Sequence, residues 1–204
     1  MARKFTHKRK NAKTRIPKPV YLIVAEGKNV TETQYFNSFN SSQNDYIVKA
    51  ARSSYVTDPE GLWNRARNLW KQYDMSTKNG DKAFVVLDLD CDPKKLRKVN
   101  KLRGKDDIEF IVSNPCFEIW FLLHFVYTTR EFKNDKDVIR ELRKHIPKYE
   151  KTMDVASFIN DKTGSAIRNV NKLKKYYEEI GVEHPSVDAN PMTDVPVMME
   201  VLKK

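Results

Sequence analysis

Cysteines and long apolar runs are both scarce in this sequence, and their scarcity excludes several classes of protein. The 204-residue chain holds two cysteines, Cys91 and Cys116, which lie far apart. Their number and spacing argue against a disulfide framework and against a zinc site. No apolar run approaches the roughly 20 residues that span a membrane, and the basic N-terminus lacks the apolar segment of a secretion signal. We therefore expect a cytoplasmic protein of one domain, with or without an appended lobe.

Acidic residues are absent from the first eighteen positions, although the whole chain contains 27 of them. The same segment carries eight basic residues: Arg3, Lys4, Lys8, Arg9, Lys10, Lys13, Arg15 and Lys18. Runs of like charge with few apolar residues stay extended and solvated. We expect residues 1–18 to form a disordered basic tail that binds the phosphates of a nucleic acid through residues such as Lys8, Arg9 and Lys10. Lys28, further along the chain, is expected to bind the nucleic acid as well. The alternative is a solubilising arm without a specific ligand.

Apolar runs that alternate with amphipathic segments predict a mixed α/β fold. Continuous apolar runs are typical of strands buried on both faces, and spacings of three and four residues are typical of helices. The expected strands cover residues 19–27, 46–51, 83–90 and 108–115, and the expected helices cover residues 29–40, 58–75, 94–104, 116–127, 137–146, 165–181 and part of 190–202. This order indicates a mostly parallel four-stranded sheet flanked by helices in residues 19–130. A helical extension in residues 131–204 should pack on it.

Carboxylates follow three of the predicted strands, at the edge where functional groups gather in parallel sheets. Glu26 ends the first strand, Asp88 and Asp90 end the third, and Glu118 follows the fourth. If the third strand continues through Asp90, then Asp88 and Asp90 project from the same face. Because like charges repel and are costly to bury, we expect Glu26, Asp88 and Asp90 to hold Mg²⁺ or Mn²⁺. A plain acidic loop is the alternative.

Other polar residues near this edge have less specific patterns. Asp92 is either a further ligand or the start of a turn at Pro93. Glu118 lies in an apolar segment, where a charged side chain must be paired, exposed or functional. His124 lies about 240° further around the helix than Glu118, so we expect a core or interface histidine. No serine or cysteine nucleophile arrangement is visible, and GKNVTET lacks the upstream glycines of a Walker loop.

Several of these segments resemble a known family. LIVAEG and VVLDLDCD are similar to the Toprim signature, in which a glutamate and a glycine follow the first strand and a D-x-D element follows the third. Together with VAEGKNVTETQYF, SNPCFEIWFLLHF and NPMTDVPVMMEVL, they resemble the RloB family, also called the AbiLii type, from about residue 18 to the last residue. The S-N-P-x-F-E-x-W-x-x-x-H-F block is the most specific of these motifs.

The resemblance implies a Toprim-like fold and a role in bacterial anti-phage defence, by abortive infection or linked to restriction, commonly with an ATPase encoded alongside. It carries over Glu26 as the acid/base glutamate and Asp88 and Asp90 as the metal-binding pair. Glu118 and His124 match a block to which no established chemistry is assigned. CDPKK replaces the glycine that usually follows the D-x-D element. This departure, and the lack of a tyrosine nucleophile domain or a zinc module, favours a small nuclease over a topoisomerase or a primase.

We therefore expect a nuclease that uses Mg²⁺ or Mn²⁺ to cleave RNA or DNA. Asp88 and Asp90 would bind the metal, Glu26 would act as acid/base or further ligand, and Glu118 would complete the site. A second hypothesis is a non-catalytic adaptor that binds nucleic acid and regulates a partner ATPase. A phosphatase or nucleotidyl enzyme is a third, which the basic tail disfavours because a small substrate needs no cationic tether. The sequence leaves open the choice between RNA and DNA, and whether the protein forms a homo-oligomer.

Overall fold

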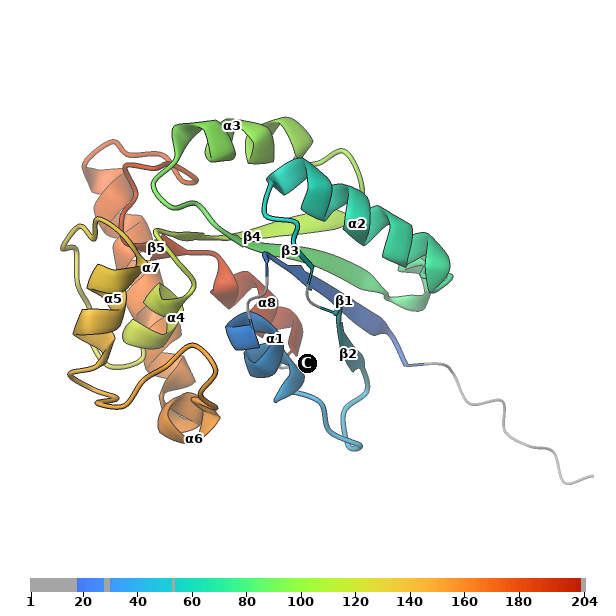
Figure 1. Cartoon of the computed structure of the whole chain (residues 1–204), viewed down its shortest axis with the longest axis horizontal. Helices are drawn as coiled ribbons and strands as arrows, with labels where there is room; N and C mark the ends of the chain where they lie inside the picture. Colours follow the sequence, from blue (N-terminus) through green and yellow to red (C-terminus); the bar gives the residue numbers. More distant parts are fainter. Residues whose placement is uncertain (1–17, 28–29, 53, 203–204) are drawn as a thin grey trace, which may run out of the picture.

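A five-stranded sheet forms the centre of the molecule (Figure 1). The computed structural model describes residues 18–27, 30–52 and 54–202. The strands are β1 (Val20–Ala25), β2 (Ile47–Ala50), β3 (Lys82–Asp88), β4 (Ile108–Asn114) and β5 (Met192–Thr193). They lie in the order β2-β1-β3-β4-β5, the first four parallel and β5 antiparallel to β4. The prediction of a mixed α/β fold with a mostly parallel sheet is therefore confirmed.

Helices cover both faces of this sheet (Figure 1). The α-helices are α1 (Val30–Asn37), α2 (Pro59–Gln72), α3 (Pro93–Leu102), α4 (Glu118–Leu122), α5 (Asp135–Leu142), α6 (Ala156–Ile159), α7 (Thr163–Glu179) and α8 (Val195–Leu202). Two short 3₁₀ helices are η1 (Thr77–Asn79) and η2 (Asn160–Lys162). α2 and α3 cover one face, and α1, α4 and α8 lie on the other, with α5 packed on α4. Within the described residues, none of these helices combines the length and the apolar character that crossing a membrane requires.

The alternation of side chains along β3 determines where its last residue points. Val85 and Leu87 belong to the hydrophobic cluster under α2 and α3. Phe84 and Val86 belong to the cluster on the face of α1, α4 and α8. Successive strand residues point to opposite faces. Asp88, the next residue in the Phe84–Val86 series, therefore points toward α1 and α4.

The apolar segment after β4 is less helical than its sequence suggests. We expected a helix over residues 116–127, but α4 contains only Glu118–Leu122. The chain then tightens, because the N–H groups of His124 and Phe125 donate to carbonyls three residues earlier, at 3.2 and 3.0 Å. Such bonds are typical of 3₁₀ turns at helix ends. The shorter helix leaves Glu118 in its first turn.

The C-terminal part of the chain packs directly on the sheet. Side chains of α7 and α8 share one hydrophobic cluster with β1, β3 and β4. Met192 and Thr193 of β5 pair with Asn114 and Ser113 at the end of β4. The expected helices are present here, but the sequence reading missed β5, because a two-residue strand shows no alternation of polar and apolar residues.

The predicted basic tail falls almost entirely outside the described residues. Lys8, Arg9 and Lys10 lie outside them, and so does Lys28. Lys18 is described, and its Nζ donates to the carbonyl oxygen of Ser42 at 3.2 Å. Nucleic-acid contacts by the tail therefore stay a prediction from the sequence.

Candidate functional site

The four carboxylates singled out in the sequence lie at the carboxyl edge of the sheet. Glu26 follows β1, Asp88 is the last residue of β3, Asp90 follows β3, and Glu118 begins α4 after β4. The backbone N–H of Asp88 donates to Oε2 of Glu26 at 3.3 Å. The other three carboxylates all act on the Asp88 side chain electrostatically. The structure therefore brings the four residues together in one acidic cluster.

Asp88 is the most enclosed member of the cluster. Burial raises the pKa of its carboxyl well above the usual range, and the charges of neighbouring carboxylates raise it further. Its Oδ1 atom is buried and has no hydrogen-bond partner among the described residues. Buried polar atoms in folded proteins are nearly always paired. An unpaired carboxylate oxygen among other carboxylates is therefore a place where a cation would be stabilising.

A fifth carboxylate, Glu32, joins the cluster from the first turn of α1. Its residue is only 2% exposed. Burial raises its pKa to about 7, and the nearby charges of Glu118 and Glu26 contribute to the rise. The sequence reading missed Glu32, although a signal was present. Glu32 precedes the buried Tyr35 and Phe36 by three and four residues, so it shares their face of the helix.

Asp90 does not project beside Asp88, which corrects the expectation drawn from their spacing. β3 ends at Asp88, and both Asp90 and Cys91 adopt left-handed backbone conformations, with φ of 53° and 55°. The N–H of Asp90 donates to the carbonyl of Pro115 at 3.0 Å, which fixes this turn to the end of β4. The side chain of Asp90 is 59% exposed. The turn therefore aims Asp90 outward.

Asp92 has a structural role at the start of α3. Its side chain accepts a hydrogen bond from the N–H of Lys94 at 2.7 Å, and Pro93 is the first residue of the helix. This arrangement is a standard helix N-cap. Of the two interpretations of Asp92, the structure shows the one in which it begins a turn.

Lys95 of α3 binds the two outer carboxylates of the cluster. Its Nζ lies 3.0 and 2.7 Å from the two carboxylate oxygens of Glu26, and 2.9 Å from Oδ2 of Asp90. The Lys95 side chain is only 11% exposed. Burial alone would lower its pKa, but the hydrogen bonds and charges of Glu26 and Asp90 outweigh burial and raise it. For Glu26, burial outweighs Lys95, so the pKa of its carboxyl is raised.

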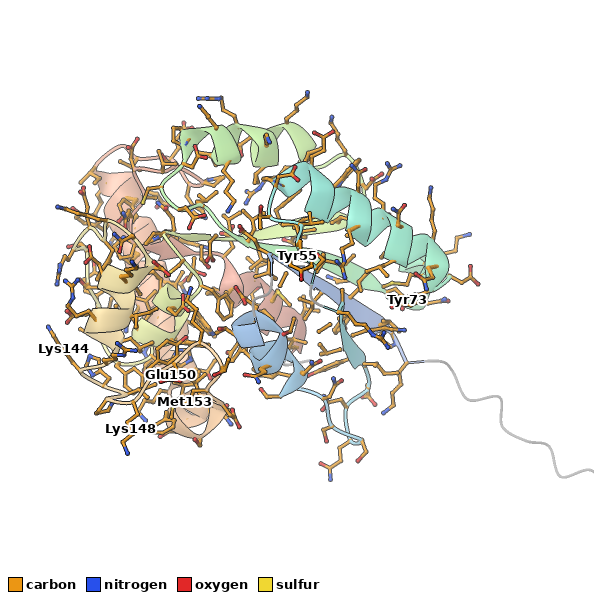
Figure 2. All side chains as sticks on the ribbon, viewed as in Figure 1. Tyr55, Tyr73, Lys144, Lys148, Glu150 and Met153 are labelled. Atoms are coloured by element: carbon orange, nitrogen blue, oxygen red, sulfur yellow. The ribbon has the colours of Figure 1, made fainter. Side chains whose placement is uncertain are left out.

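The loop after α5 supplies the partners of Glu118. The hydroxyl of Tyr149 donates to Oε1 of Glu118 at 3.1 Å, and Nζ of Lys151 lies 3.7 Å from the same oxygen. Lys151 also pairs with Asp135 at 3.1 Å. The hydroxyl of Thr31 in α1 donates to the carbonyl of Lys151 at 2.5 Å. Figure 2 labels Lys148 and Glu150, the neighbours of Tyr149, on this loop.

His124 lies in the hydrophobic core, away from these contacts. Its residue is buried, its Nδ1 lies 2.8 Å from the carbonyl oxygen of Trp120, and its ring meets the Trp120 ring edge to face. The expectation of a core histidine is therefore confirmed.

A cavity of about 410 Å³ opens beside the outer carboxylates. It is lined by Glu26, Asp90 and Lys95 and by Thr57, Asp58, Pro59, Asp92, Lys94 and Lys98. Carboxylates and lysines thus share one opening, which suits a ligand that carries both phosphate and a divalent cation. A larger cavity of about 570 Å³, with Lys82 and Ile108 in its lining, lies at the opposite end of β3 and β4. Cavity size alone therefore does not locate the acidic site.

The donor set of the cluster fits a hard divalent cation. Mg²⁺ and Mn²⁺ prefer carboxylate oxygens, and Oδ1 of Asp88 is a buried carboxylate oxygen without a hydrogen-bond partner among the described residues. As the side chains lie, however, no three histidine, cysteine or acidic residues in the described ranges form a group that could hold a metal ion. Some of the carboxylates would therefore have to rotate toward an ion for it to be held.

Comparison with known proteins identifies the family of the chain. Neither the curated proteins nor the solved structures contain a match. The family model described as RloB-like protein matches residues 21–202, which include every carboxylate of the acidic cluster and both of its lysines. This match covers most of the chain, and the protein therefore belongs to the RloB-like family.

Proposed function

We propose that this protein is a metal-dependent nuclease with a Toprim-like site that cleaves the phosphodiester bonds of RNA or DNA. The observation that carries the proposal is the carboxylate cluster around Asp88, whose buried Oδ1 atom has no hydrogen-bond partner among the described residues. A cluster of this charge is costly to bury without a cation. Two of its carboxylates, Glu26 and Asp90, also line a cavity that contains lysines able to bind phosphate.

Each residue of the cluster has a distinct part in this proposal. Asp88, flanked by Glu32 and Glu118, would hold Mg²⁺ or Mn²⁺. The ion would supply electrostatic stabilisation of the charge on the phosphate oxygens. Glu26 lines the cavity, and burial raises the pKa of its carboxyl, which favours a role in accepting or donating a proton. The sequence also predicted Glu26 and Asp90 as metal ligands; because oxygens of both residues contact Nζ of Lys95, we assign the metal to Asp88, Glu32 and Glu118 instead.

Basic residues would hold the substrate. Lys94 and Lys98 line the cavity and are exposed, so both can reach phosphates that enter it. The sequence adds the tail residues Lys8, Arg9 and Lys10, and Lys28 after β1. The family resemblance further supports a role in anti-phage defence together with an ATPase partner.

A non-catalytic adaptor is the second candidate, and one observation favours it. Lys95 already pairs with Glu26 and Asp90, and Lys151 with Glu118, so part of the acidic charge is balanced by the chain itself. In an adaptor, the cluster would be structural and would bind no metal. The basic tail would then carry the interaction with nucleic acid.

Metal binding by calorimetry separates the two candidates. Wild-type protein should bind Mn²⁺ or Mg²⁺, and Asp88→Asn, which keeps the shape of the side chain, should abolish binding. Asp45→Asn, at an exposed residue in the loop before β2, is the matched control and should bind as the wild type does. Cleavage of single-stranded RNA and DNA oligonucleotides, with and without the partner ATPase, is then assayed with the same proteins. A folded wild type that binds neither ion, even with oligonucleotide present, would contradict the nuclease and favour the adaptor.

A further inference from the structure

The acidic cluster consists of two parts that differ in the partners of their carboxylates. We call Asp88, Glu32 and Glu118 the inner group, and Glu26 and Asp90 the outer pair. The inner group contains Oδ1 of Asp88, which no residue described by the structure pairs with. The outer pair shares one cation, the ammonium of Lys95, through both oxygens of Glu26 and one of Asp90.

The ammonium of Lys95 uses all of its hydrogen-bond donors on the outer pair. A lysine ammonium has three N–H donors and no acceptor. Three carboxylate oxygens lie within 3.0 Å of Nζ, so each donor has an acceptor. Lys95 therefore contacts the same oxygens that a divalent cation at the outer pair would require.

The fold holds Lys95 in this place. α3 is fixed at its start by the Asp92 cap and along its length by the buried Val99 and Leu102. Lys95 is largely buried, whereas Lys94 and Lys98 on the same helix are exposed and form no ion pair with any residue that the structure describes. The placement of Lys95 therefore differs from that of the other lysines around the cavity.

We propose that Lys95 takes the place of a second divalent cation, so that this site binds a single ion, at the inner group. This inference rests on the proposed metal-dependent function. It assigns Lys95, and not a metal ion, as the cation that the outer pair binds. Without Lys95, the oxygens of Glu26 and Asp90 that now share its ammonium would lie close together and lose their common ion-pair partner. Like charges so close bind a cation or take up a proton.

The number of bound Mn²⁺ ions tests this inference directly. Equilibrium dialysis and electron paramagnetic resonance count the bound ions in wild-type protein, in Lys95→Met and in Lys98→Met. Lys98→Met is the matched control, because it removes one positive charge from the same cavity and breaks no ion pair within the described part of the chain. We expect one ion in the wild type, two in Lys95→Met and one in Lys98→Met. Two ions in the wild type, or no additional ion in Lys95→Met compared with the wild type, would overturn the inference.

Asp90→Asn provides a second test that leaves Lys95 in place. Asp90 is largely exposed, so its replacement should leave the fold intact. Asp90→Asn should bind one ion as tightly as the wild type, whereas the double variant Lys95→Met/Asp90→Asn should lose the additional ion. A weaker or missing ion in Asp90→Asn alone would overturn the inference, because Asp90 would then be a ligand in the wild type.

Failure of the proposed metal site gives a different result from failure of this inference. A wild type without any bound ion contradicts the metal site at Asp88. A single new ion in Lys95→Met would, even then, support the assignment of Lys95 as a cation in place of a metal. One ion in both proteins supports the metal site and overturns the inference.

Discussion

The hydroxyl of Tyr149 donates a hydrogen bond to Oε1 of Glu118 across 3.1 Å, and so joins the loop after α5 to the first residue of α4. Tyr149→Phe removes this donor and leaves an acceptor buried, which costs about 1–3 kcal/mol. We expect the free energy of unfolding, measured by urea denaturation, to fall by this amount. Tyr127→Phe, at a partly exposed residue, is the control and should change little. An equal loss in Tyr149→Phe when Glu118 is already alanine, which has no side-chain acceptor, would show that the hydrogen bond is not the cause.

Stability of the metal-free protein should decrease as the pH rises from about 4.5 to about 7. Burial raises the pKa of Glu32 from 4.5 to about 7, so the folded state binds more protons than the unfolded state in this window. Under that condition the free energy of unfolding falls with pH, by at most about 1.4 kcal/mol per pH unit for one group. Denaturation at several pH values should show a smaller decrease in Glu32→Gln. Glu200→Gln, at an exposed residue of α8, should keep the wild-type slope.

Asp194 should stabilise the protein at neutral pH and cease to do so in acid. Burial alone would raise its pKa, but the hydrogen bond from His184 at 2.6 Å and the charge of Arg103 outweigh burial and lower it. A lowered pKa in the folded state gives stability that is present above the unfolded pKa and lost as the pH falls through the folded one. Asp194→Asn should therefore lower the free energy of unfolding by about 3 kcal/mol at pH 7.

Measurements at low pH complete this test. The difference in the free energy of unfolding between the wild type and Asp194→Asn should decrease as the wild-type carboxyl becomes protonated. Asp188→Asn, at an exposed residue of the same region, should match the wild type throughout. A difference that stays constant from neutral to acidic pH would mean that the loss of stability does not come from the charge of Asp194.

The basic tail should make nucleic-acid binding depend on salt. Each phosphate contact with a lysine or arginine releases a counterion, so the slope of log K against log salt changes by about 0.7–0.9 per contact. Replacing Lys8, Arg9 and Lys10 by glutamine should reduce this slope by about 2–3 in binding titrations. The same change at Lys172, Lys174 and Lys175 of α7 is the control. If both triple variants have equal slopes, the tail makes no special contribution.

Tyr55 should stack on a base of a single-stranded substrate. It is 85% exposed on the segment between β2 and α2, where Figure 2 labels it. The N–H of Gly27 donates to the carbonyl of Val56 at 2.9 Å, and Thr57 and Asp58 line the cavity, so Tyr55 stands close to the site. Tyr55→Ala should weaken binding of a single-stranded oligonucleotide by about 1–3 kcal/mol. Tyr55→Trp should retain it, and Tyr127→Ala should have no effect.

Much of the fold is predictable because periodicity and burial determine it together. The continuous apolar runs of β1 and β3 can be satisfied only by burial on both faces of a sheet. Their alternation with amphipathic helices then requires parallel crossovers. Parallel strands all end at the same edge of a sheet. The residues that end or follow β1, β3 and β4 therefore meet at this edge: Glu26, Asp88, Asp90 and Glu118. β5 escaped prediction because only its pairing with β4 makes it a strand.

The partners of the carboxylates were not predictable from the same rules. Lys95 reaches Glu26 because α3 crosses above the edge, and Tyr149 reaches Glu118 because a distant loop folds back onto α4. Neither approach leaves a periodic signal in the sequence. The direction of Asp90 depends on two successive left-handed residues, Asp90 and Cys91, in a turn without glycine. Such conformations are uncommon outside glycine and are held by the surrounding structure.

The acidic cluster depends on the loop after α5 as well as on the edge of the sheet. Tyr149 and Lys151 belong to the expected helical extension, yet they are the residues that accompany Glu118 in the expected α/β core. A fragment that ends at residue 130 would keep all five carboxylates and lose both of these partners, together with β5. Grafting the core alone onto another protein would thus transfer the acidic residues without the environment that holds them. The acidic cluster therefore needs both the α/β core and the segment after α5, and attempts to shorten the chain should fail first at Glu118.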